Sequence, residues 1–196
     1  MYPKVVLDLV GFWFPFFVAA DIVAWLGFRI RRRISRAGLA KYIGLILWIS
    51  IVTDVLFLVS GNQVGLSQSS ARLLIIMSTL SYGVLFYRSR PVISAAFECY
   101  VVGVYAEILS DFARSYIIPA SFSPVYWGGA GVNDLIFQLG LLMAILYLPS
   151  TLIPTLVYAV TRRKLDSINF FAEKLIGKRA LEWALKKRLS TASAPN

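Results

Sequence analysis

The chain contains 196 residues, of which 58% are hydrophobic, and it carries a net charge of +10. Soluble domains contain roughly 45–50% apolar residues. A mean hydropathy of +0.71 therefore excludes an ordinary soluble domain and indicates a membrane protein. The positive charges flank apolar runs, where basic residues contact anionic lipid headgroups. We therefore expect the lipid bilayer and anionic lipid headgroups as partners, and no nucleic acid.

The chain has a single cysteine, Cys99, and no histidine. An intramolecular disulfide is thereby excluded. Haem bound through histidine, most zinc and copper sites and histidine-based catalytic triads are excluded as well. We expect no haem and no zinc. Mg²⁺ and Ca²⁺ prefer oxygen ligands, so these are the metals that the acids of this chain could bind.

Five apolar runs predict an all-α, polytopic helical membrane protein with about five transmembrane helices. A spanning helix needs roughly 18 or more apolar residues, and the runs cover residues 5–28, 42–60, 71–87, 91–109 and 135–160. Only one basic residue, Lys4, precedes the first run, and a basic cluster follows it. A secretory signal peptide has the reverse order, so we expect this run to be retained as a helix.

The basic residues alternate between the two sides of these five spans. Seventeen of the 20 lie at 29–41, at 88–90 or after 161, and the other side carries Lys4, Arg72 and Arg114. Positively charged loops remain in the cytoplasm. The sequence therefore predicts an integral membrane protein with its N-terminus outside and its C-terminus cytoplasmic.

Two acids lie in the inner half of the spans. Asp21 and Glu98 are each eight residues from the nearest basic residue of the cytoplasmic side, which places both about 12 Å above that edge at about 1.5 Å per residue. If they meet in one layer, they would share a proton or hold a cation, because like charges close together cannot both ionise cheaply. In the alternative, both are protonated and hydrogen-bonded to serines and tyrosines such as Ser50, Ser94 or Tyr100.

The outer half is richer in charge. Glu107, Asp111 and Arg114 are spaced i, i+4 and i+7, so they share one stripe if the fourth helix continues that far. This face could turn inward toward Arg72 or Asp134. Ionisable residues in a membrane span are candidates for function. Our candidates for a ligand or ion pathway are Asp54, Glu107, Asp111, Arg114, Asp134 and Arg72 in the outer half, with Asp21 and Glu98 in the inner half.

The segment between the fourth and fifth spans is rich in proline, glycine and aromatic residues. Pro119 and Pro124 would end the fourth helix, and Asn133 or Asp134 is a suitable N-cap for the fifth. The segment is then either a cover for the outer face, anchored by aromatic side chains, or a loop that lines or gates a site.

The fifth span contains Pro149 and Pro154. Each proline removes a backbone hydrogen bond and kinks the helix. Hydroxyls must then satisfy the freed carbonyls, and the candidates are Ser150, Thr151 and Thr155. The kink is either static or a hinge.

The chain divides into a bundle, residues 1–164, and a basic cytoplasmic tail, residues 165–196. Apolar residues of the tail share one helical face before Gly177 and a different face after it, so we expect two short amphipathic segments. They would lie on the inner membrane surface or, in the alternative, dock to a partner. A disordered end is expected to follow them.

Two functions of different classes fit these features, and neither assigns a catalytic residue. In the first, the chain is a non-catalytic component of a membrane complex, or one protomer of a homo-oligomeric carrier or channel, with polar sites in its outer half. In the second, it is a small membrane-embedded enzyme that acts on a lipid or lipid-linked phosphate. That enzyme would hold a divalent cation through Asp54, Glu107, Asp111 and Asp134, and the phosphate through Arg72 and Arg114.

Overall fold

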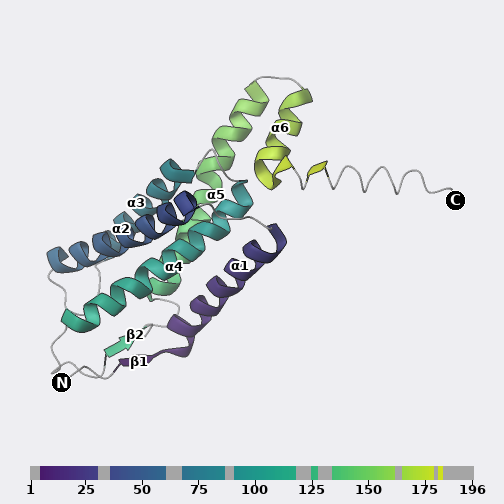
Figure 1. Ribbon diagram of the computed structural model, residues 1–196. Coiled ribbons are helices and arrows are strands. Elements are labelled where there is room, and N and C mark those ends of the chain that lie inside the picture. Colours follow the sequence, from purple (N-terminus) through teal and green to yellow (C-terminus); the bar gives the residue numbers. More distant parts are fainter. Residues whose placement is uncertain are drawn as a thin grey trace.

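The computed structural model describes residues 5–30, 36–60, 68–86, 91–117, 125–127, 134–161, 165–178 and 181–182. These residues form the helices η1 (Leu9–Trp13, a π-helical turn), α1 (Phe14–Ile30), α2 (Arg36–Ser60), α3 (Gln68–Phe86), α4 (Val92–Ile117), α5 (Leu135–Thr161) and α6 (Leu165–Ile176), and the strands β1 (Val5–Leu7) and β2 (Val125–Trp127) (Figure 1). By length and composition, five helices of the described residues can cross a membrane, one of them formed by η1 with α1. The protein is therefore an all-α polytopic membrane protein, as predicted.

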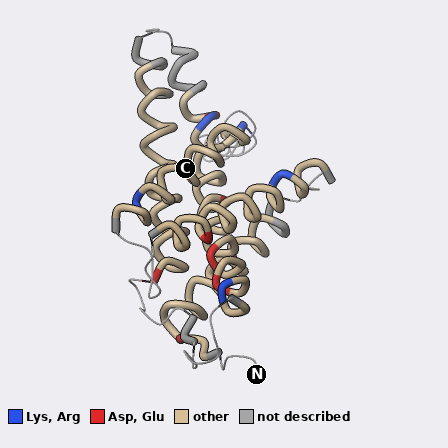
Figure 2. The backbone as a smooth tube through the Cα atoms, turned by 90° about the vertical axis from the view of Figure 1, so that its left-hand side faces the viewer, with Lys and Arg blue, Asp and Glu red and all other residues tan. Residues whose placement is uncertain are grey.

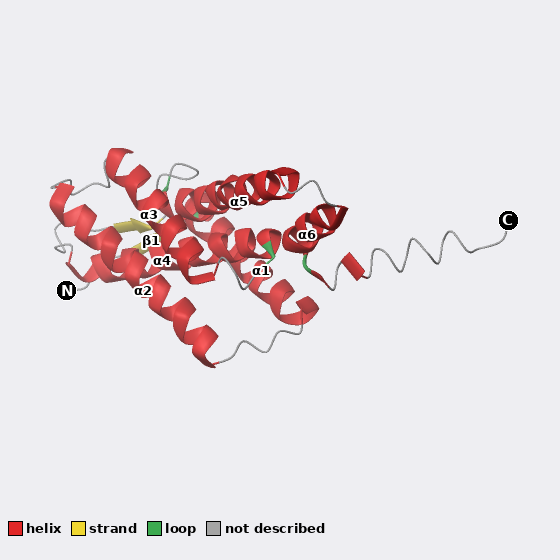
Figure 3. Ribbon diagram, turned by 90° about the horizontal axis from the view of Figure 1, so that it is seen from above, coloured by secondary structure: helices red, strands yellow, loops and turns green. Residues whose placement is uncertain are grey.

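Helix α4 lies at the centre of the bundle. Of its spanning segment 61% is buried, against 33% or less for the other four spans. Figure 1 shows α1 on one side of α4, with α2 and α3 on the other, and Figure 3 shows the same bundle from above. Large apolar side chains on the outer faces of α2 and α3 remain exposed, among them Leu58, Val59, Leu80 and Val84. In a membrane, lipid or another protein covers such faces.

Helices α4 and α5 cross closely, and the crossing is built on two glycines. A Cβ atom added to Gly103 would lie 2.8 Å from the Cα atom of Gly140, and one added to Gly140 would lie 2.9 Å from the carbonyl oxygen of Tyr100. Small residues let the backbones of membrane helices approach in this way. The crossing fixes α5 against the helix that carries Glu107, Asp111 and Arg114.

The predicted start of the first helix, at residue 5, is wrong. Val5–Leu7 is a strand that pairs in parallel with Val125–Trp127. Helical structure begins at Leu9, because the Asp8 carboxylate accepts hydrogen bonds from the backbone N–H groups of Val10 at 2.9 Å and Gly11 at 2.8 Å. These two bonds satisfy N–H groups that have no partner at a helix start.

Helix α4 runs to Ile117, beyond the end predicted at residue 109. The additional two turns contain charged residues, and these are paired with one another and with α2 instead of being left unpaired in the bilayer. Paired charges remove the reason for the helix to stop at the end of the apolar run. Because the helix continues past Arg114, Glu107, Asp111 and Arg114 lie on one stripe of α4, as expected for a helix of this length.

The prolines of α5 are accompanied by hydroxyls bonded to the backbone. Ser150 Oγ donates to the carbonyl oxygen of Tyr147 at 2.9 Å, and Thr151 Oγ1 donates to those of Tyr147 at 2.8 Å and Leu148 at 3.1 Å. The carbonyl that Pro149 frees is that of Ile145, four residues earlier. These two hydroxyls thus bond neighbouring carbonyls and not the freed one, a geometry that itself bends helices. The side chain of Thr155 lies outside the described residues.

Helix α6 folds back beside α5 and reaches the start of α4 (Figure 1). Gly177 follows it with φ +89°, a left-handed conformation, and a Cβ atom there would lie 3.0 Å from Cγ of Pro91. The break expected at Gly177 is confirmed. The end of the tail, which we expect to be disordered, lies outside the described residues.

Candidate functional site

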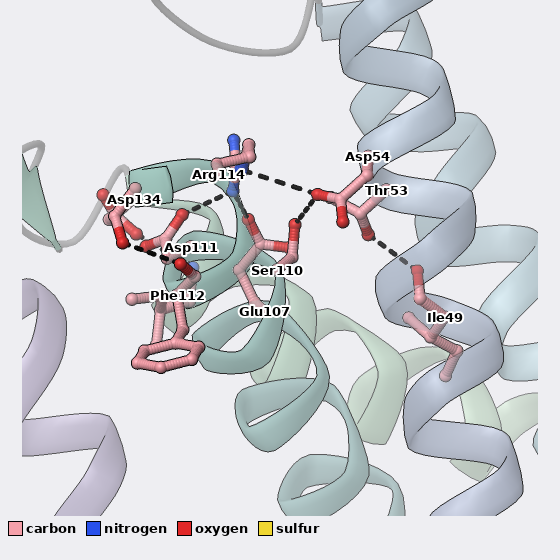
Figure 4. A network of polar contacts seen from close by, with 11 residues as sticks. Ile49, Thr53, Asp54, Glu107, Ser110, Asp111, Phe112, Arg114 and Asp134 are labelled. Carbon is pink, nitrogen blue, oxygen red and sulfur yellow. Dashed lines mark hydrogen bonds and ion pairs between the residues drawn. The ribbon is translucent and has the colours of Figure 1, made fainter. Parts of the chain in front are cut away.

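Three charged side chains of α4 form a cluster near its C-terminal end (Figure 4). Arg114 Nη2 donates to Glu107 Oε1 at 2.6 Å and also to Oδ1 of Asp111. The helix brings these residues to one face because they are spaced at i, i+4 and i+7. One guanidinium nitrogen is thereby shared by two carboxylates.

Helix α2 contributes a third carboxylate to this cluster. Asp54 Oδ1 accepts a hydrogen bond of 2.6 Å from Ser110 Oγ and lies 3.7 Å from Arg114 Nε. The guanidinium also lies over the ring of Phe57 on α2, 5.1 Å from its centroid, a cation–π contact. These contacts link α2 to α4 inside the bundle.

The fourth carboxylate lies at the start of α5. Asp134 Oδ1 accepts a hydrogen bond of 2.9 Å from the backbone N–H of Ile136, so Asp134 caps the helix, one of the two roles predicted for it. Asp134 also interacts electrostatically with Glu107 and Asp111. Figure 4 shows Asp134 beside Asp111. We call Asp54, Glu107, Ser110, Asp111, Arg114 and Asp134 the outer network.

The outer network is mostly buried. The side chain of Glu107 is 1% exposed, and those of Arg114, Asp111 and Asp54 are 13%, 17% and 22% exposed. Glu107 Oε2 and Arg114 Nε are buried without a hydrogen-bond partner among the described residues. Unpaired buried polar atoms are rare and need an explanation.

Charge in the outer network is unbalanced. It holds four carboxyl groups and one guanidinium, which would be a formal charge of −3 if every acid were ionised. Figure 2 shows acidic residues gathered beside a basic one in this part of the bundle. Like charges packed together away from water cannot all ionise cheaply, so full ionisation of these acids is unfavourable.

A divalent metal ion does not fit this arrangement. The described residues contain no group of three or more acidic or cysteine side chains placed to hold a metal ion. The carboxylates of Glu107 and Asp111 converge on the Arg114 guanidinium instead. In this structure these two carboxylates therefore pair with a guanidinium.

Arg72 does not join the outer network. It is exposed on α3, and it makes no ion pair in the part of the chain that the structure describes. The charged stripe of α4 therefore turns toward α2 and the start of α5, and not toward Arg72. Spacing within α4 alone could not distinguish these neighbours.

The inner-half acids are also separate. Glu98 is buried, and its Oε2 accepts hydrogen bonds from Tyr82 Oη at 2.7 Å and from Tyr42 Oη. Asp21 is exposed on α1, and no hydrogen bond joins it to Glu98 within the described ranges. The proposed layer of two carboxylates is therefore not formed. Tyrosines do bond Glu98, but they are Tyr42 and Tyr82 instead of Tyr100.

Sequence reasoning missed Tyr42, Tyr82 and Ser110. Tyr82 lies six residues before Arg88, about 9 Å above the basic edge, a depth close to that of Glu98, so a depth comparison could have found it. Ser110 lies one helical turn after Glu107, on the same stripe of α4. Tyr42 carries no comparable signal, because it lies beside Lys41 at the edge of its span.

No protein-family model matches the chain, and no curated protein or solved structure shows significant similarity to it.

Proposed function

We propose that the protein is a non-catalytic membrane component whose outer network is its functional element, as one protomer of an oligomeric carrier or channel or as a subunit of a larger membrane complex. The observation that carries the proposal is that four acids and one arginine from three helices converge at one end of the bundle, with Glu107 buried and the others partly buried. Charged residues in membrane spans are expensive and mark ion and substrate pathways.

The shape of the bundle supports an assembly. Among the five spans of the described residues, α4 alone is mostly buried, so a single chain offers little protein around a pathway. Exposed apolar faces on α2 and α3 are available to a second copy or a partner subunit. The pathway would then run along an interface between chains.

The distribution of basic residues supports the orientation. Seventeen of 20 lie on one side of the five spans, which places the N-terminus outside and the C-terminus in the cytoplasm by the positive-inside rule. The outer network then lies near the external surface of the cell membrane.

The enzyme alternative receives less support. It needs a divalent cation held by the outer acids and a phosphate bound by Arg72 and Arg114. Arg114 already contacts three carboxylates, which would repel a phosphate, and Arg72 lies apart on α3.

The test is reconstitution of the purified protein into liposomes with an imposed proton or Na⁺ gradient. We expect flux above that of empty liposomes, reduced in Asp54→Asn, and a cross-linked mass larger than one chain. Glu182→Gln, an exposed change outside the bundle, is the control and should keep the wild-type flux. An inert monomer would contradict the carrier or channel. If no partner chain then co-purifies with the protein from its own membrane, the subunit role is contradicted as well.

Titration of the protein with Mg²⁺ or Ca²⁺ distinguishes the enzyme alternative from the proposed function. A ligand that binds the native state raises its melting temperature. A saturable rise with Mg²⁺ or Ca²⁺, absent in Glu107→Gln and Asp111→Asn, together with hydrolysis of a lipid phosphate, would replace the proposed function by the enzyme. We expect no such rise.

A further inference from the structure

Glu107 has one carboxylate oxygen that the described structure leaves without a partner. Oε1 accepts a hydrogen bond from Arg114, whereas Oε2 is buried and has no hydrogen-bond partner among the described residues. The side chain is 1% exposed, and its carboxyl group points into the outer network (Figure 4). An unsatisfied, buried, charged oxygen is strongly unfavourable, so this position calls for a ligand.

Charged groups of α4 and α5 act directly on Glu107. Arg114 and Asp111 come from α4 and Asp134 from the start of α5. Asp54 of α2 acts on Asp111 and Arg114. Within the described ranges of α1 and α3, no charged group joins this network. Among the described residues, one guanidinium thus faces several carboxyl groups around Glu107.

The group that satisfies Glu107 Oε2 must be small. The acids of the network do not form a metal site in the described structure. The side chain of Glu107 is 1% exposed, so it is closed to the water that a hydrated cation would bring with it. A proton needs no cavity. On Glu107 Oε2 it would convert the unsatisfied acceptor into a donor toward one of the neighbouring carboxylates, Asp111 or Asp134.

We propose that the outer network is a proton-binding site, in which Glu107 and the adjacent carboxylates hold at least one proton. Asp54 and Asp111 are 22% and 17% exposed, so they give the proton a route to water at this end of the bundle. The inference deepens the proposed function and rests on it for a role in transport, where the proton would be the cargo or the coupling ion.

Infrared spectroscopy of the purified protein in detergent tests the site directly. We expect the carbonyl stretch of a protonated carboxyl group at neutral pH, and we expect Glu107→Gln to reduce it. Because the proton could move to a neighbour in that variant, Asp111→Asn is measured as well. Asp21→Asn, which removes an exposed acid of α1, is the matched control and should keep the wild-type band.

Thermal unfolding against pH gives a second measure. If the native network holds a proton that the unfolded chain releases, the native state binds more protons, so stability falls as pH rises. The unfolding constant should then increase about tenfold per pH unit for each such proton. Glu107→Gln should flatten this dependence, and Asp21→Asn should not.

The results distinguish the two proposals. A wild-type band unchanged in both Glu107→Gln and Asp111→Asn, or no band at all, would overturn the proton site even if liposomes show flux. A band lost in these variants, from a protein that neither assembles nor carries any flux, would leave the proton site standing and refute the proposed function.

Discussion

Arg114 is the residue on which the outer network depends. It contacts Asp54, Glu107 and Asp111 with its guanidinium and Phe57 with its face. Buried acids that lose a counter-ion are left with uncompensated charge, which costs far more than the pair itself contributes.

We therefore expect Arg114→Gln to destabilise the protein by about 3–5 kcal/mol, the range for breaking a buried ion pair. Arg72→Gln is the matched control, since Arg72 is exposed on α3, and changes of that kind shift stability by about 0.5 kcal/mol or less. Thermal melting in detergent measures both. Equal melting temperatures for the two variants would show that the ion pairs contribute nothing to the fold.

The sequence predicted contacts between residues of one helix better than contacts between residues of different helices. The i, i+4, i+7 spacing placed Glu107, Asp111 and Arg114 together on α4, as the structure shows. The contact of Asp54 with Ser110 depends on how α2 and α4 are rotated toward each other. That rotation cannot be predicted from the spacing of residues along the chain or from their depth in the membrane.

The close crossing of α4 and α5 predicts that a larger residue at Gly103 destabilises the protein. Gly103→Ala places a methyl group 2.8 Å from the Cα atom of Gly140. Overpacking of this kind costs about 1–3 kcal/mol, more than the gain of up to about 1 kcal/mol from replacing glycine in a helix. We expect a lower melting temperature.

Gly83→Ala is the matched control for that substitution. Gly83 also lies inside a helix, and a Cβ atom there would meet nothing within 4 Å, so only the favourable helix term remains and the melting temperature should stay or rise. A similar effect of both alanines would show that the backbones of α4 and α5 are not in close contact.

The apolar runs identified the five spans because length and hydropathy are sufficient to recognise a membrane helix. They did not locate the start of the first one. Val5–Leu7 is apolar and reads as helix, yet it pairs with Val125–Trp127, a strand far along the chain. A contact between distant segments leaves no periodic trace in either.

For the whole molecule, the orientation can be tested with cysteines. The natural cysteine, Cys99, is buried, so a new one can be followed in the intact chain. Arg72→Cys lies toward the proposed outer end and Glu182→Cys toward the inner end, and both positions are exposed. A thiol reagent that cannot cross membranes should label Arg72→Cys in intact cells and Glu182→Cys only after permeabilisation. The reverse pattern would invert the topology.

Helix α5 introduces a dependence on the membrane itself. It has 27 residues, about 40 Å at the usual rise, whereas the hydrocarbon core is about 30 Å thick. When the hydrophobic stretch of a helix is longer than the hydrocarbon core is thick, the helix tilts or the bilayer thickens around it. The Gly103–Gly140 crossing couples any tilt of α5 to α4, so bilayer thickness becomes a variable that acts on the geometry of the acids around Arg114.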